Sequence, residues 1–166
     1  MELLLFRHGI AEPGTHGQSD FDRALTPEGV ERTRQAARGL TRIADAPDVI
    51  LTSPKKRAVQ TASIVGRAFD MEPVTEDTLA EGPAARVIQM LTARTESSVM
   101  LVGHEPWMSE LIERLCVPRQ SAGFIDLKKA GCALVEAPLH RDEPAGRGVL
   151  RWLIPPRALR SMGGDD

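Results

Sequence analysis

The segment LLLFRHG at residues 3–9 decides the fold, because it joins a short apolar run to two polar side chains and a glycine. A run of large apolar residues that ends at a glycine is typical of a strand buried on both faces of a sheet. Such strands occur in α/β proteins, whose ligands bind beyond the carboxyl ends of the strands. We therefore expect Arg7 and His8 at a binding edge, although an isolated pair of this kind is more often an ordinary part of the surface.

Strand and helix patterns alternate along the rest of the chain. Short apolar runs predict strands at 3–6, 49–52, 73–75, 98–102, 124–127, 132–135 and 149–154. Capping residues, prolines and spaced apolar residues predict helices that begin at Thr26, Ser53 and Pro106, and one more around 87–91. This alternation predicts the α/β class: a three-layer α/β/α sandwich with a mainly parallel central sheet and one or more antiparallel edge strands.

Length and composition narrow the range of functions. The 166 residues predict one domain over residues 1–158 and a flexible tail over 159–166. The formal net charge of -2 favours neither a nucleic-acid nor a membrane partner, and no apolar run reaches the length of a membrane span. Cys116 and Cys132 lack metal-type spacing. With no secretory signal ahead of the first strand, we expect a cytoplasmic protein with reduced cysteines.

Polar side chains follow three of the predicted strands. Arg7 and His8 end the first strand, Arg57 follows residues 49–52, and His104 follows residues 98–102. Because the carboxyl ends of parallel strands share one edge of the sheet, we expect these side chains to meet beside helix N-termini. Such a pocket favours a small, multiply charged anion, most simply a phosphoryl group.

Each of these residues also has a simpler interpretation. Arg57 would be a solvated residue at a helix start, as we expect for Lys55 and Lys56. His104 would cap the helix that follows it, and Glu81 would be a solvated loop carboxylate. For any one of these residues, the simpler interpretation is at least as good as the functional one. The functional interpretation depends on the residues occurring together.

The set resembles a known family. Arg7-His8-Gly9, Ser53-Pro54 followed by Arg57, Gln60 and Thr61, and Val102-Gly103-His104 are similar, in this order, to three signatures of the histidine phosphatase superfamily, the phosphoglycerate-mutase-like proteins. The segments DRALTPEG at 22–29 and VGHEPWMSELI at 102–112, together with the short chain, resemble the SixA-type branch, whose named members are phosphohistidine phosphatases. The long insertions of the mutases have no counterpart here.

This resemblance implies a role for each site residue. His8 would be the nucleophile that becomes phosphorylated, and Arg7, Arg57 and His104 would bind the phosphoryl oxygens, with His104 protonated. Glu81 would be the proton donor to the leaving group. The expected reaction is metal-independent hydrolysis of a phosphomonoester or phosphoramidate through a phosphohistidine intermediate, with no cofactor.

Three possibilities stay open at this point. The chain would act on phosphohistidine in a protein, on a small phosphorylated metabolite, or, as a non-catalytic domain, only bind phosphate. The first two share the same pocket chemistry. They would differ in the side chains of the loop at 10–25, which carries Asp20, Asp22 and Arg23 among other polar residues.

Overall fold

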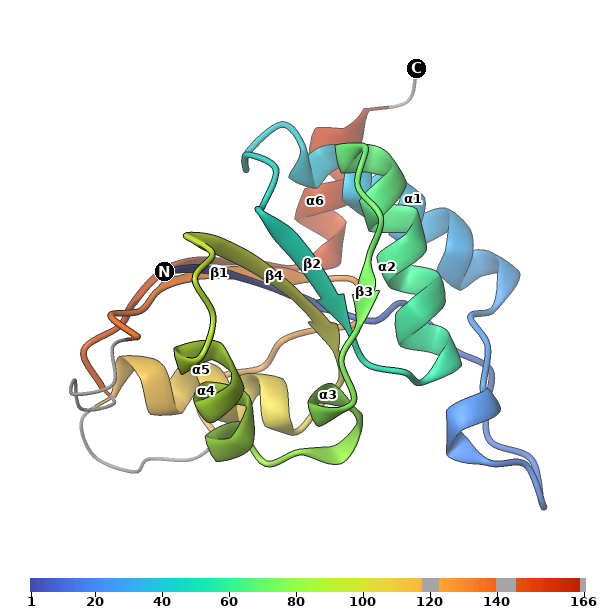
Figure 1. Cartoon of the computed structure of the whole chain (residues 1–166). Coiled ribbons are helices and arrows are strands. Elements are labelled where there is room, and N and C mark those ends of the chain that lie inside the picture. Colours follow the sequence, from blue (N-terminus) through green and yellow to red (C-terminus); the bar gives the residue numbers. More distant parts are fainter. Residues whose placement is uncertain (118–122, 140–145, 165–166) are drawn as a thin grey trace.

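The computed structural model describes residues 1–117, 123–139 and 146–164. Within these residues, six strands form one sheet in the order β3-β2-β4-β1-β5-β6 (Figure 1). The strands are β1 (Glu2–Arg7), β2 (Val49–Thr52), β3 (Val74–Thr75), β4 (Ser98–Gly103), β5 (Cys132–Glu136) and β6 (Val149–Ile154). The helices are the 3-10 turn η1 (Asp20–Asp22), α1 (Pro27–Leu40), α2 (Lys56–Phe69), α3 (Thr78–Glu81), α4 (Ala84–Thr92), α5 (Trp107–Cys116) and α6 (Pro156–Gly163).

Strand pairing places the carboxyl ends of β1, β4 and β2 next to one another. The pairs β1–β4, β4–β2 and β2–β3 are parallel, whereas β5 pairs with β1 and with β6 in the antiparallel sense. The predicted mainly parallel sheet with antiparallel strands at one edge is therefore confirmed. β1 lies inside the sheet, which explains why an uninterrupted apolar run forms it.

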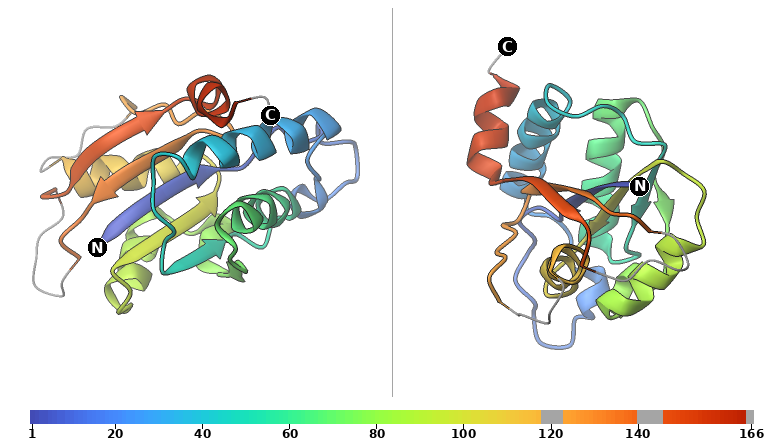
Figure 2. Two further views of the ribbon diagram at one scale, coloured as in Figure 1. Left: turned by 90° about the horizontal axis from the view of Figure 1, so that it is seen from above. Right: turned by 90° about the vertical axis from the view of Figure 1, so that its left-hand side faces the viewer.

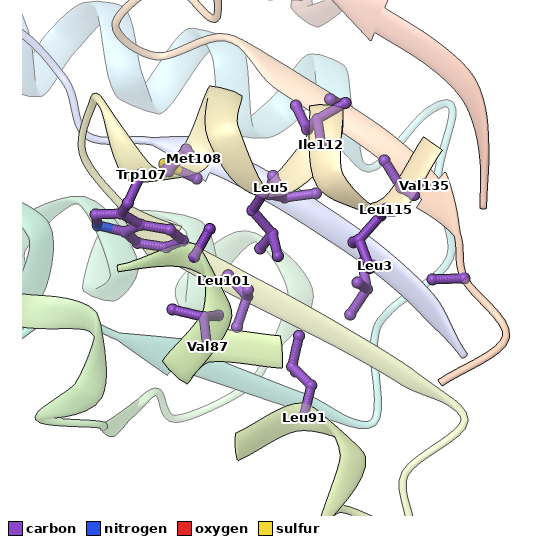
Figure 3. Close-up of a cluster of buried hydrophobic side chains, with 14 of the residues drawn as sticks. Leu3, Leu5, Val87, Leu91, Leu101, Trp107, Met108, Ile112, Leu115 and Val135 are labelled. Carbon is purple, nitrogen blue, oxygen red and sulfur yellow. The ribbon is translucent and has the colours of Figure 1, made fainter. Parts of the chain in front are cut away.

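Helices cover both faces of the sheet, so the predicted three-layer architecture is also confirmed (Figure 2). Leu4 and Phe6 of β1 pack with α1, α2 and α6 on one face, and Leu3 and Leu5 pack with α4 and α5 on the other. Figure 3 shows Leu3, Leu5 and Leu101 in this second cluster. Each of these four β1 side chains is at most 2% exposed. Burial of one such side chain stabilises the fold by roughly 1.5–3 kcal/mol, and this anchors the strand that ends at His8.

The strand predicted at 124–127 is wrong. The backbone N–H groups of residues 123–125 donate to Oε1 of Glu113 at 3.0 to 3.1 Å, and Glu113 is only 6% exposed. A buried carboxylate on α5 therefore binds the donors that a sheet ladder would have used. The apolar pattern at 124–127 instead anchors a loop through the buried side chain of Leu127.

The predicted tail over 159–166 is also corrected, because helix α6 continues to Gly163. Leu159 is fully buried in the cluster that includes α1. Gly39 of α1 permits this contact, since a Cβ atom there would lie 1.8 Å from the carbonyl oxygen of Leu159. Residues 165–166 lie outside the described residues. Helix α6 has only eight residues, so its apolar face is too short to give a clear helical pattern in the sequence.

Candidate active site

The three predicted junctions meet at one edge of the sheet. The His8 amide donates to the Gly103 carbonyl at 2.9 Å, which ties the end of β1 to the end of β4. The ring centroids of His8 and His104 lie 6.4 Å apart, and Nε of Arg57 donates to Nε2 of His8 at 3.3 Å. The structure thus brings His8, Arg57 and His104 together, as the sequence predicted.

Arg57 reaches the site from the first turn of α2, which begins at Lys56 and not at Ser53. The Ser53 hydroxyl accepts only a long 3.4 Å hydrogen bond from the Lys55 amide, so it does not cap the helix as predicted. The Thr61 hydroxyl donates to the Arg57 carbonyl at 2.7 Å and accepts from the Gly9 amide at 3.1 Å. This hydroxyl couples the first turn of α2 to the segment after His8.

Gly9 lets the segment after His8 lie directly against α1. A Cβ atom at this position would lie 2.3 Å from the Thr33 hydroxyl oxygen and 3.2 Å from the Gly29 carbonyl. The first distance is shorter than a Cβ atom can make, and the second is tighter than most such contacts. The glycine of the Arg7-His8-Gly9 motif is therefore required by the packing between the site and α1.

The hydrogen bonds of His8 fix its tautomer. Nδ1 lies 2.7 Å from the Gly9 carbonyl, and because a carbonyl only accepts, Nδ1 carries the hydrogen. Burial lowers the pKa of His8 to about 3, with further lowering by the charges of Arg57 and Arg7, while the Gly9 carbonyl opposes the shift. The ring is therefore neutral at pH 7, with the lone pair of Nε2 directed toward Arg57.

Arg7 and His104 each have one buried polar atom without a partner in the described part of the chain. Nη1 of Arg7 donates to the Leu127 carbonyl at 2.7 Å, and its Nε has no partner. Nε2 of His104 donates to the Ala80 carbonyl at 2.7 Å, which leaves Nδ1 without one. A buried polar atom without a partner is costly. Nε of Arg7 is a donor that an anionic oxygen would satisfy, and Nδ1 of His104 becomes such a donor once the ring is protonated.

Without a bound anion, the ring of His104 is neutral at pH 7, whereas the expectation of a protonated His104 concerns the state with a phosphoryl group bound. Burial lowers the pKa of His104 to about 4, and the charges of Lys55 and Arg57 lower it further, although the Ala80 carbonyl and Asp20 oppose this. A phosphoryl dianion beside Nδ1 would favour protonation. Protonation of this ring is therefore coupled to binding of the anion.

Lys55 was predicted to be solvated, and this is wrong, because it is only 5% exposed. Its Nζ donates to Oδ2 of Asp20 at 2.9 Å and to Oε1 of Glu81 at 3.4 Å, and it lies 5.4 Å from the ring centroid of Phe21. No local sequence pattern distinguishes Lys55 from its exposed neighbour Lys56.

Asp20 enters the site from η1. Its Oδ2 accepts from Nη2 of Arg57 at 3.0 Å and from Lys55, and its backbone carbonyl accepts from Nη1 of Arg57 at 2.7 Å. Hydrogen bonds from Arg57 and Lys55 hold the pKa of Asp20 well below its usual range, so this carboxylate is ionised. Asp20 is one of several polar residues in the loop at 10–25, and sequence reasoning did not select it.

Glu81 ends the short helix α3 instead of lying in a loop, and its side chain is 74% exposed. Phe21, Ala80, Glu81 and Arg86 line part of a cleft of about 470 Å³. Since Phe21 and Glu81 also contact Lys55, this cleft adjoins the pocket formed by His8, Arg57 and His104. Glu81 therefore lies at the rim of the pocket formed by His8, Arg57 and His104.

Two further observations concern residues 1–117, 123–139 and 146–164. In these ranges no group of three or more histidine, cysteine, aspartate or glutamate side chains is arranged to hold a metal ion. In the same ranges, no helix combines the length and the apolar character that crossing a membrane would require.

The pKa values of the two histidines lead to a testable expectation. In an NMR titration, the rings of His8 and His104, assigned by loss of their signals in H8A and H104A, should remain neutral from about pH 8 to about pH 5. Unfolded histidine gains its proton near the ordinary pKa of 6.5, so these two rings should lower the free energy of unfolding as the pH falls below 6.5. A midpoint near 6.5 for either ring would contradict the buried, neutral state.

Comparisons with known proteins agree with this geometry. Residues 3–84 match the model of the histidine phosphatase superfamily (branch 1). The chain is 28% identical to phosphohistidine phosphatase SixA of Escherichia coli over 96% of this chain and 97% of that protein. It is 31% identical to the SixA homologue of Haemophilus influenzae over 75% of this chain and 82% of that protein. A solved structure of the protein histidine phosphatase SixA complexed with tungstate superimposes with a TM-score of 0.79 at 27% identity, covering 96% of this chain and 99% of that chain.

Proposed function

Because this chain belongs to the histidine phosphatase superfamily, in its SixA branch, and is a phosphatase, we propose that it hydrolyses phosphohistidine through a phosphorylated His8, without a metal ion. The observation that carries this proposal is the state of His8. Its Nδ1–H is bound to the Gly9 carbonyl, and its neutral Nε2 lies beside Arg57. An imidazole in this state is a nucleophile poised among groups that bind a phosphoryl oxygen.

In the first step, the Nε2 lone pair of His8 attacks phosphorus and forms an N–P bond. The bond from phosphorus to the substrate nitrogen breaks, and its electron pair stays on that nitrogen, which takes up a proton from Glu81 or from solvent. Nε of Arg7, the guanidinium of Arg57 and Nδ1 of His104 would stabilise the phosphoryl oxygens. Phosphoryl transfer depends mainly on such positioning and charge stabilisation, which these residues provide.

In the second step, water attacks the phosphorus of phosphorylated His8. The N–P bond breaks, its electron pair returns to Nε2, and the proton of the water passes to Glu81 or to solvent. Orthophosphate then leaves, and His8 is again neutral with Nδ1 bound to the Gly9 carbonyl. This cycle regenerates the nucleophile without any other cofactor.

Two features support phosphohistidine as the substrate. The leaving imidazole needs less help from an acid than an alkoxide does, and the proposed donor, Glu81, is largely exposed at the rim. The relatives in Escherichia coli and Haemophilus influenzae carry the phosphohistidine phosphatase name, and the tungstate held by the solved SixA structure is a tetrahedral oxyanion like phosphate.

The partner that we propose is a protein phosphorylated on histidine, in the cytoplasm. Asp20, Phe21 and Glu81 are all partly or largely exposed, so a side chain of another protein can approach the pocket. Both cysteines are free, in keeping with a reducing compartment. A small phosphorylated metabolite is the second candidate, because the cleft beside Arg86 has room for one.

A comparison of substrates separates these candidates. We expect a protein phosphorylated on histidine to give a higher kcat/KM than an alkyl phosphate or a panel of small phosphorylated metabolites, measured as orthophosphate release. E81Q should lower kcat/KM for phosphohistidine by less than about tenfold and lower that for the alkyl phosphate further, because the alkoxide depends more on the acid. E72Q, which changes an exposed carboxylate between α2 and β3, is the matched control. A metabolite preferred over phosphohistidine protein would favour the second candidate.

A further inference from the structure

Two cations converge on one carboxylate oxygen at the site. Oδ2 of Asp20 lies 2.9 Å from Nζ of Lys55 and 3.0 Å from Nη2 of Arg57. The side chains of Lys55 and Arg57 are only 7% and 6% exposed, whereas that of Asp20 is 47% exposed. The cations are therefore fixed parts of the site, and the anion between them is the accessible member.

The same oxygen lies next to the nucleophile. Arg57 donates through Nε to Nε2 of His8 at 3.3 Å and through Nη2 to Oδ2 of Asp20. One edge of a single guanidinium thus joins the attacking nitrogen to an anionic oxygen. A phosphoryl group attacked by His8 would place one of its oxygens where Oδ2 of Asp20 now lies.

Asp20 is held in a way that permits it to leave. It belongs to the short turn η1, and its other oxygen, Oδ1, lies 2.9 Å from Nη1 of Arg23, whose side chain is 25% exposed. Arg23 therefore offers an alternative partner at the surface. Lys55 and Arg57 are buried cations, which require an anion close by. Besides Asp20, Lys55 has the exposed carboxylate of Glu81 at 3.4 Å.

We propose that Asp20 is an exchangeable counter-ion and that Lys55 is a further catalytic residue, which binds a phosphoryl oxygen together with Arg57 after the substrate displaces the Asp20 carboxylate. The identity of the displacing ligand, a phosphoryl group, rests on the proposed function. An entering group must compete with a carboxylate of single charge for two buried cations. The exchange therefore favours a phosphoryl dianion over anions that carry one charge.

Orthophosphate binding tests this exchange, measured by titration calorimetry at a pH where orthophosphate is the dianion. D20N should bind orthophosphate about tenfold more tightly than the wild type, because the internal competitor is gone. K55M should bind it about tenfold more weakly, because one charge-assisted contact is lost. D22N and K56M, which change exposed neighbours, are the matched controls and should bind as the wild type does. In the K55M background, the D20N substitution should raise the affinity for orthophosphate by a smaller factor than it does in the wild type.

Two results would overturn the proposal. Weaker orthophosphate binding by D20N would mean that Asp20 only positions the two cations, and unchanged binding by K55M would exclude Lys55 as a phosphoryl ligand. Should K55M fail to fold, as judged by circular dichroism, K55Q applies the same test, and K55R, which keeps the charge, should bind orthophosphate more tightly than K55Q does. Orthophosphate binding needs no attack by His8, so a failure here is distinct from a failure of the proposed hydrolysis, which H8A tests.

Discussion

H8A is expected to lose at least about four orders of magnitude in kcat for phosphohistidine hydrolysis, because alanine removes the only atom that forms the N–P bond in the proposed mechanism. The variant should also fail to retain labelled phosphate after a rapid acid-free quench, whereas the wild type should carry it on His8. The His8 ring makes two hydrogen bonds, from Nδ1 to the Gly9 carbonyl and from Nε of Arg57 to Nε2, so circular dichroism should confirm that H8A is folded. Orthophosphate release and incorporation of label are the two measurements.

H16A provides the control for this experiment. His16 is exposed in the loop at 10–25, so its removal should leave both turnover and labelling at the wild-type level. Near-normal turnover by H8A would end the assignment of His8 as nucleophile. Loss of turnover with label still present would place the phosphorylated residue elsewhere in the chain.

R57A is expected to lower kcat/KM by about a hundredfold to a thousandfold, equal to about 3–4 kcal/mol of transition-state stabilisation. The guanidinium contacts both Nε2 of His8 and Oδ2 of Asp20, so its removal takes away the group that aligns the nucleophile with the phosphoryl oxygen. The effect should appear mainly in kcat, because the charge that Arg57 stabilises develops during transfer.

R57K separates the charge of Arg57 from its geometry. Lysine keeps the positive charge but cannot donate along one planar edge to two partners, so R57K should recover only a small part of the lost activity. R67A, on the exposed face of the same helix, should behave as the wild type does. Activity of R57A within a few-fold of the wild type would place Arg57 outside the reacting groups.

The sequence predicted those parts of the molecule that depend on regular patterns. β1 and β4 could be recognised because both are continuous apolar runs, and their polar ends then had to share one edge of a parallel sheet. His8, Arg57 and His104 meet for this reason. This prediction also required the strands to be neighbours, and the sheet places β2, β4 and β1 next to one another.

The parts that sequence reasoning missed depend on single contacts between distant residues. Glu113 binds the amides of residues 123–125, and no local pattern indicates that a carboxylate on α5 would replace a sheet partner. Lys55 is buried because Asp20 and Glu81 converge on it from two other segments. Such ion pairs carry no periodic signal, so they emerge only once the chain is folded.

The position of β1 within the sheet has a consequence for biosynthesis. β1 lies between β4 and β5, and both partners come from much later in the chain, at residues 98–103 and 132–136. During translation, the strand that carries His8 therefore emerges long before the segments that bury it. Pairing between such distant segments is slow, and the apolar run at 3–6 stays exposed in the meantime. We expect the nascent chain to depend on holdase chaperones until β5 has left the ribosome. His8 is therefore synthesised before β4 and β5, but the site around it forms only after these strands have paired with β1.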